Sequence, residues 1–155
     1  MKNFLLRLKT RIAALWQAPR PATENGAAAA GEWGEGQAAK FLQRNGWRIL
    51  ERRARPSRRG EIDLVATAGE TLVFVEVKTR RNEDYGSPRS SVGFAKRRAL
   101  NRAAIRWLRR ARWPKLACRF DIVEVIGSPL SKTPPVIRHI EGAFPFEQRW
   151  MMPPR

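Results

Sequence analysis

The feature that most limits the possible folds of this chain is a pair of apolar runs joined by a tight turn. Residues 60–80 read GEIDLVATAGETLVFVEVKTR, which is typical of two strands joined by a short Ala-Gly turn. Three charged residues, Asp63, Glu76 and Lys78, interrupt runs that would otherwise be wholly apolar, as in strands inside a sheet. Burying a charge without a partner is costly, so these groups are expected to bind one another or a ligand.

The rest of the chain alternates helix-like and strand-like patterns. Apolar residues recur at helical spacing over 31–45 and again over 94–112, and Pro114 follows the second run. Strands are expected at 47–55, 61–67, 71–80 and 118–126, with a short strand or a turn at 136–144. This order predicts a single α/β domain with a mixed central sheet flanked by helices.

Composition narrows the chemistry that the chain can perform. Its 155 residues suffice for one domain with a real core, and 31 Lys and Arg against 14 Asp and Glu give a formal charge of +17. Such an excess favours polyanionic partners such as nucleic acid or an anionic membrane. One cysteine, Cys118, and one histidine, His139, exclude an intrachain disulfide and a Cys/His zinc site. Any catalysis is therefore expected to use carboxylates, lysine and an oxygen-preferring metal.

The three charged residues of the strand pair can meet at one place. Side chains alternate along a strand, so Glu76 and Lys78 face the same side. The hairpin brings Asp63 opposite residue 75 or 76, so that both carboxylates converge. Hard oxygen ligands of this kind suit Mg²⁺ or Mn²⁺, which also bind substrate phosphates. Such an ion lowers the pKa of its bound water, and Lys78 could orient the attacking hydroxide or stabilise the phosphorus centre.

Ordinary structural roles compete with this interpretation. Glu76 and Lys78 could form a salt bridge on a solvated strand face, and Asp63 could be an edge-strand charge that discourages aggregation. Both carboxylates stand among apolar neighbours typical of inner strands, which favours a site. Glu61 either pairs with Arg58 or Arg59 or lies at the rim of the site, and both alternatives stay open.

Several motifs, in order along the chain, resemble one protein family. They are Gly31 to Leu42, RRGEIDLVA, LVFVEVKTR, the YGSP…SV…K loop and CRFDIVEV. Together they cover most of residues 31–146 and are similar to the YraN (UPF0102) family of predicted bacterial endonucleases. That family is in turn similar to the PD-(D/E)xK restriction-endonuclease-like nucleases, especially to Holliday-junction resolvases.

The resemblance implies a restriction-endonuclease-like fold and a metal-dependent endonuclease that hydrolyses DNA, branched DNA included. It implies that Asp63, Glu76 and Lys78 are the acids and the lysine of the signature. It also implies that Glu35, on the first helix, joins the two acids as catalytic residue and metal ligand. Ile62 stands where the signature has a loosely kept proline. Because family members are largely uncharacterised, a nucleic-acid-binding module with weak or no activity is the alternative.

Basic residues gather before Gly60, after the third strand and along the second long helix. That helix has no acidic partners at i±4, so its self-repulsion is expected to be offset by a polyanion. Arginine favours bidentate phosphate contacts, which predicts backbone binding that weakens steeply with salt and reads few bases. The residues expected to contact nucleic acid are Arg58, Arg59, Arg80, Arg81, Lys96, Arg97, Arg98 and Arg102.

The chain is expected to have three parts. Residues 1–30 form a basic amphipathic helix and a linker, residues 31–147 the nuclease domain and residues 148–155 a flexible tail. Basic residues interrupt the N-terminal apolar face, so it is not a signal peptide, and no apolar run approaches the roughly 20 residues that span a bilayer. We expect a bacterial cytoplasmic protein, nucleoid association included. Cutting both strands of a symmetric junction together would need a homodimer.

Overall fold

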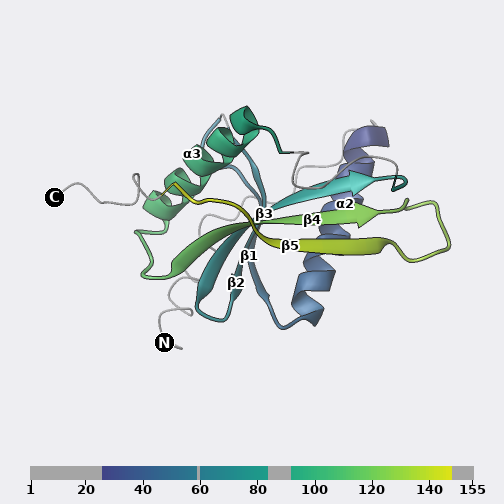
Figure 1. Cartoon of the computed structure of the whole chain (residues 1–155), viewed down its shortest axis with the longest axis horizontal. Coiled ribbons are helices and arrows are strands. Elements are labelled where there is room, and N and C mark those ends of the chain that lie inside the picture. Colours follow the sequence, from purple (N-terminus) through teal and green to yellow (C-terminus); the bar gives the residue numbers. More distant parts are fainter. Residues whose placement is uncertain (1–25, 59, 84–91, 148–155) are drawn as a thin grey trace.

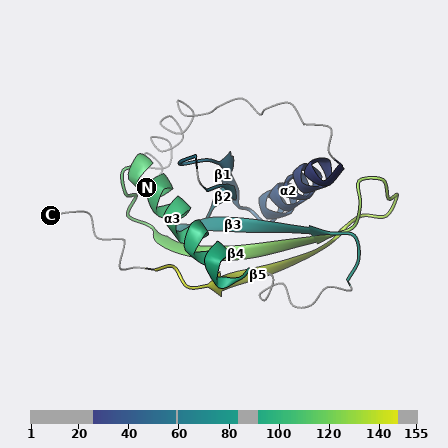
Figure 2. The same cartoon turned by 90° about the horizontal axis from the view of Figure 1, so that it is seen from above.

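A five-stranded mixed sheet lies between two helices in the computed structural model of the protein (Figure 1, Figure 2). The elements in chain order are α2 (Gly26–Arg44), β1 (Arg48–Ala54), β2 (Ile62–Ala68), β3 (Thr71–Arg80), α3 (Phe94–Arg110), β4 (Ala117–Ile126) and β5 (Val136–Phe144). The strands lie side by side in the order β1-β2-β3-β4-β5. Only β3 and β4 are parallel, and α3 makes the crossover between them. The predicted α/β architecture, a restriction-endonuclease-like fold in a single domain, is confirmed.

The structure describes residues 26–58, 60–83 and 92–147. The amphipathic helix expected at the N-terminus, the C-terminal tail and Arg59 lie outside these ranges. Within them, no helix is both long enough and apolar enough to cross a membrane.

The hairpin of β2 and β3 forms the inner part of the sheet. Its turn begins at Gly69, whose φ of 58° lies in the left-handed region that glycine adopts without strain. The antiparallel ladder runs from the Ala68–Thr71 pair to the Leu64–Val75 pair. Leu64 and Val75 belong to the core on the α2 side, whereas their neighbours on the other face pack under α3. Both strands read as almost continuous apolar runs because helices cover both faces.

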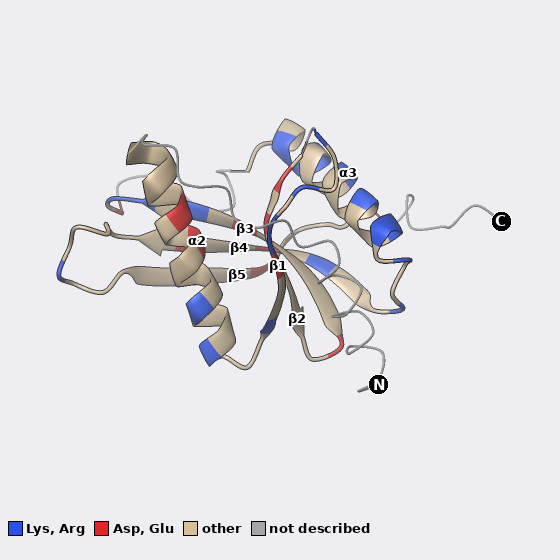
Figure 3. Ribbon diagram, turned by 180° about the vertical axis from the view of Figure 1, so that it is seen from behind, with Lys and Arg blue, Asp and Glu red and all other residues tan. Residues whose placement is uncertain are grey.

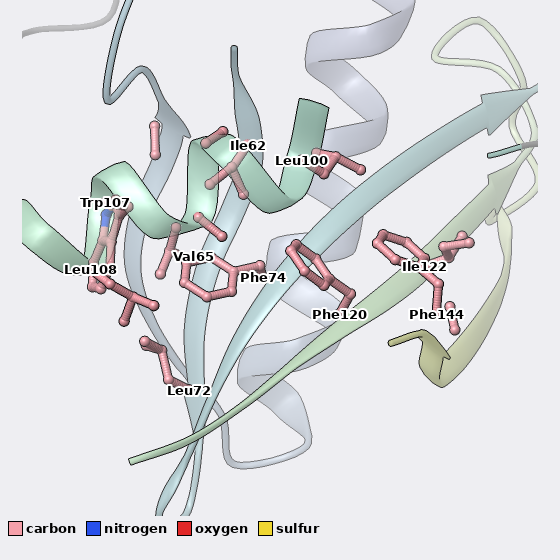
Figure 4. Close-up of a cluster of buried hydrophobic side chains, with 14 of the residues drawn as sticks. Ile62, Val65, Leu72, Phe74, Leu100, Trp107, Leu108, Phe120, Ile122 and Phe144 are labelled. Atoms are coloured by element: carbon pink, nitrogen blue, oxygen red, sulfur yellow. The ribbon is translucent and has the colours of Figure 1, made fainter. Parts of the chain in front are cut away.

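α3 covers one face of the sheet with the stripe that its spacing predicts (Figure 4). Trp107 and Leu108 are buried against Phe74, and the rings of Phe74 and Trp107 meet edge to face with centroids 5.8 Å apart. Burial of each such side chain contributes about 1.5–3 kcal/mol. The remaining buried members of the stripe are Leu100, Ala103 and Ala104.

α2 covers the other face, mainly through small side chains and Leu42, which packs on β2, β3 and β4. The helix is already formed at Gly26, the first described residue of this segment and five residues before the expected Gly31, because the alanines at 27–30 are strong helix formers. Its predicted end is confirmed: Gly46 has a φ of 83°, and Trp47 N–H returns to the Leu42 carbonyl at 3.0 Å.

Two further boundaries differ from the expectation. α3 ends at Arg110 because the chain turns at Ala111, and Arg112 and Trp113 then adopt positive φ angles. β5 is a full strand, since its residues from Val136 onward pair with β4 in antiparallel register.

Candidate metal centre

β2 and β3 separate just beyond the Leu64–Val75 pair, the last pair of their ladder. From there β2 stays paired with β1, while β3 stays paired with β4. Asp63 lies in this opening, and its Oδ2 accepts the backbone N–H of Val77 at 2.7 Å. The carboxylate therefore spans the gap between two strands that no longer share a ladder. We call this place the fork, and Glu35, Glu61, Asp63 and Glu76 the fork acids.

Glu76 contributes a carboxylate from β3 that is 4% exposed. Two ammonium groups share its Oε1: Lys78 Nζ at 2.9 Å and, from the first turn of α3, Lys96 Nζ at 3.3 Å. Its Oε2 is buried, and no hydrogen-bond partner is present among the described residues. A buried carboxylate oxygen without a partner is rare in folded proteins, and an unseen ion is one of its ordinary explanations.

Glu35 reaches the fork from α2 because the helix approaches β3 very closely. A Cβ at Gly34 would overlap the Thr79 hydroxyl, so only glycine permits this approach. Glu35 is buried and accepts the Nε–H of Arg53 at 2.6 Å. That hydrogen bond is the main cause that raises the pKa of the Arg53 guanidinium.

Arg53 has an unusual backbone. Its φ is 50°, a left-handed value that few non-glycine residues adopt, and β1 pairs with β2 on either side of it, at Arg52–Leu64 and Ala54–Ile62. The strain is located where the side chain turns to Glu35, which is typical of functional sites.

Glu61 lies beside the other acids, just before β2. Glu35, Glu61 and Asp63 each offer a carboxylate oxygen, and these three oxygens lie within 4.8 Å of one another. Glu61 also pairs with Arg55 at 2.7 Å. Among the described residues the arginine partner of Glu61 is therefore Arg55 and not Arg58, one of the two arginines expected from the sequence. Glu61 is also one of the three acids of the cluster.

Crowding of the acids changes the protonation of one of them. Burial, followed by repulsion from Glu76, raises the pKa of Asp63 from 3.8 to about 7. Glu35 adds to this repulsion, whereas the Val77 N–H and Lys96 favour the charged form. A divalent cation would relieve the same repulsion.

The donor set fits a hard divalent cation. Glu35, Glu61 and Asp63 form the cluster of close oxygens, and among the described residues it contains no histidine or cysteine. Glu76 is not one of these three acids, but it is near enough to raise the pKa of Asp63, and its Oε2 is buried without a partner. Oxygen ligands of this type suit Mg²⁺ or Mn²⁺ and disfavour metals that prefer nitrogen or sulfur.

The basic residues expected to contact nucleic acid lie in different settings. The Arg80 guanidinium pairs with buried Glu124 at 2.9 Å and is 15% exposed, which is the position of a structural ion pair. Arg97 Nε donates to the Val92 carbonyl at 2.8 Å, and Lys96 is engaged by Glu76. The exposed members of the set with described positions are Arg58, Arg81, Lys96, Arg98 and Arg102.

Asp121 on β4 is a buried carboxylate outside the fork, and it has a structural role. It accepts hydrogen bonds from Arg119 and from Gly142 N–H, and it lies 2.8 Å from His139 Nε2. These contacts hold β5 to β4 beside the irregularity that follows Phe120. His139 is thus engaged locally.

Sequence reasoning missed two contributors to the site. No pattern points to Arg53, because its role depends on a left-handed backbone angle inside a strand. Lys96 was expected to contact nucleic acid rather than Glu76. Gly34 did carry a readable signal, since a glycine inside a helical pattern often marks close packing.

The fold and the fork acids together define an α/β protein with a restriction-endonuclease-like sheet and a carboxylate cluster able to hold a metal ion. The chain belongs to UPF0102, described as an uncharacterised protein family, whose family model matches residues 34–125. That match begins at Gly34, where α2 contacts β3, and it includes all four fork acids.

Bacterial relatives support the same assignment. A UPF0102 protein of Symbiobacterium thermophilum is 52% identical over 99 residues, which cover 64% of this chain and 83% of the relative. A UPF0102 protein of Geobacter metallireducens is 43% identical over 114 residues, covering 74% of this chain and 90% of the relative. Another, of Rhodococcus opacus, is 43% identical over 119 residues, covering 75% and 96%.

Proposed function

We propose that the protein is a metal-dependent endonuclease that hydrolyses phosphodiester bonds in DNA, with branched, Holliday-junction-like DNA among its substrates. The observation that carries the proposal is the buried, unpartnered Oε2 of Glu76, which lies at a fork lined by three further carboxylates and two lysines. Glu124 Oε2 also lacks a hydrogen bond, but the Arg138 guanidinium lies 3.6 Å from it, whereas both lysine contacts of Glu76 are made through Oε1. A metal ligand would keep such an oxygen for the ion.

Asp63, Glu76 and Glu35 would hold Mg²⁺ or Mn²⁺, with Glu61 at the rim. When bound, the ion would supply an activated water and neutralise charge on the phosphodiester. Asp63 must be deprotonated to bind it, and the N–H of Val77 stabilises that form. Arg53 fixes the position of Glu35 through its hydrogen bond.

Lys78 is the group best placed to act on the substrate. Its side chain is 27% exposed, and its Nζ lies 2.9 Å from Glu76 Oε1, so it is next to the ligand set and still open to solvent. From this position its ammonium would orient the attacking oxygen and stabilise negative charge on the phosphate.

The proposal extends to the setting in which the enzyme acts. Phosphate contacts would come from Arg58, Arg59, Arg81, Lys96, Arg98 and Arg102, whereas Arg80 and Arg97 would support the structure. The catalytic domain would be residues 31–147, preceded by a helix and linker in 1–30 and followed by a tail in 148–155. The enzyme would work in the cytoplasm at the nucleoid, as a homodimer where both strands of a junction are cut.

A second candidate is a nucleic-acid-binding module without activity. One observation favours it: Lys78 and Lys96 together offset the charge of Glu76 without any metal. In this case the fork would be a stable ion-pair cluster, and the basic surface alone would carry the function.

Incubation with labelled four-way junction, flap, single-stranded and linear DNA, with Mg²⁺ or Mn²⁺, separates the two. We expect metal-dependent cleavage that Asp63→Asn and Lys78→Ala abolish while DNA binding persists. The matched control is Glu70→Gln, the same loss of charge at the exposed β2–β3 turn. Binding without cleavage across all substrates and both metals would reject the enzyme and select the module.

A further inference from the structure

The outward face of α3 carries a groove that the fork does not use. A cavity of about 300 Å³ is lined there by Arg98, Asn101, Arg102, Ile105, Arg106, Arg109 and Glu147. One wall is set by the segment after β5, because Glu147 N–H donates to the Asn101 side-chain oxygen at 2.9 Å. Basic residues recur along the whole helix (Figure 3). We call this cavity the α3 groove.

The arginines of α3 differ in their contacts. Arg98 lies over the Phe94 ring, and Arg106 donates to the Ser57 hydroxyl at 3.1 Å. Arg97 and Arg110 are partly buried and bonded, Arg97 to the Val92 carbonyl and Arg110 to Glu51. By contrast, Arg102 and Arg109 are exposed and form no ion pair with any carboxylate of the described residues. Unrelieved repulsion between like charges three or four residues apart destabilises a helix unless an anion offsets it.

The groove has the features of a site for a row of phosphates. Its arginines recur every three or four residues, so they form one ridge with steps of about 5–6 Å. Guanidinium groups bind phosphate with two parallel hydrogen bonds. In its inner part Ile105 is apolar, and the Asn101 amide already bonds the Arg97 carbonyl and the Glu147 N–H, so neither offers a free donor and acceptor pair for reading base edges.

α3 connects this groove to the fork. Lys96, in the first turn of the helix, contacts Glu76 at the fork, whereas the ridge of exposed arginines faces away from the sheet. At about 1.5 Å per residue, Arg109 lies about 20 Å along the axis from Lys96, which corresponds to about six phosphates of one DNA strand. A ligand that occupies both places has to cross the first turns of α3 and continue along the helix.

We propose that the α3 groove binds the phosphate backbone of a duplex DNA arm beside the position that is cut, and so sets a minimum length for the substrate. This inference rests on the proposed function for its DNA substrate, but the groove binds without the metal and without catalysis. It makes the preferred substrate an extended or branched duplex rather than a nucleotide or a short end.

The test measures DNA binding in EDTA, by fluorescence anisotropy, with duplexes of about 8 and about 30 base pairs over a salt series. The groove variant is Arg102→Gln/Arg109→Gln. Its control is Lys40→Gln/Arg44→Gln, which removes the same charge from exposed positions of α2 on the other face of the sheet. We expect the groove variant to bind the long duplex roughly 10- to 100-fold more weakly at moderate salt, with a salt slope smaller by about two. The short duplex and the control variant should change much less.

Equal weakening of both double variants would overturn the proposal, because net charge alone would then explain binding. Unchanged binding by the groove variant, or equal loss on both duplex lengths, would also overturn it. Cleavage assays keep the two proposals apart. If no metal supports cleavage while the groove variant still binds the long duplex more weakly, the proposed nuclease activity is rejected and the DNA-binding role of the groove is retained. If cleavage is found but the groove variant binds like the wild type, the nuclease activity is retained and the role of the groove is rejected.

Discussion

Asp63 is the residue in which the demands of folding and of the fork conflict most. It lies near the start of β2, a well-packed inner strand. Glu76 and Glu35 repel its carboxylate, and only the Val77 N–H and Lys96 stabilise the charge. Its pKa of about 7 means that the folded protein binds a proton there more tightly than the unfolded chain does. A residue selected only for stability would not be charged in this position.

This conflict predicts a pH-dependent effect of Asp63→Asn. Because the folded pKa lies above the ordinary 3.8, the stability that Asp63 contributes is fully present below about pH 4 and is lost as pH rises through about 7. Asparagine has no charge to bury and can still accept the Val77 N–H. We therefore expect the variant to equal the wild type near pH 4 and to exceed it by roughly 2–4 kcal/mol above pH 7 in metal-free buffer.

Urea unfolding of both proteins across this pH range measures the difference. Glu70→Gln, in the exposed turn, is the control and should show no such trend. A stability difference between Asp63→Asn and wild type that stays constant from pH 4 to pH 8 would contradict the assigned protonation.

At the level of elements, the fork depends on how closely α2 approaches β3. Gly34 is the point of contact, and the next residue is the Glu35 that joins the acidic cluster. Packing and site geometry are therefore coupled through one turn of helix. Displacement of α2 would withdraw Glu35 from Asp63 while leaving the β2–β3 hairpin intact.

This coupling predicts opposite effects for two alanine substitutions in α2. In Gly34→Ala the new methyl group overlaps the Thr79 hydroxyl, so we expect a loss of about 1–3 kcal/mol and weaker metal binding. In Gly31→Ala the methyl group meets nothing within 4 Å, so we expect a gain of about 0.5–1 kcal/mol from helix propensity. Denaturant unfolding and metal titration of both variants check this. If Gly34→Ala is as stable as Gly31→Ala, α2 does not approach β3 as described.

At the scale of the whole molecule, most of the fold could be predicted from the sequence. Two apolar runs and a glycine turn predict the β2–β3 hairpin. The spacing of apolar residues predicts the buried stripe of α3, which has Trp107 and Leu108 at its centre. The ends of the elements were harder to predict. α2 includes residues from Gly26 onward because the helix propensity of its alanines extends it beyond the amphipathic pattern. Periodicity reports which face is buried, and it says little about where a helix stops.

The candidate site was predictable only where it follows strand geometry. Side-chain alternation places Glu76 beside Lys78, and the hairpin register places Asp63 near both. Convergence of Glu35 and Lys96 on the same point depends on how helices far apart in the chain pack on opposite faces, which spacing does not encode. The family resemblance supplied Glu35 for that reason.

Calorimetric titration of Mn²⁺ into the protein at about pH 8, where Asp63 is ionised, tests the central claim most directly. The account predicts saturable binding by the wild type and by the turn control Glu70→Gln, and loss of that binding in Glu76→Gln. Absence of heat in the wild type with or without DNA, or equal heat in Glu76→Gln, would contradict the assignment of the fork as a metal centre.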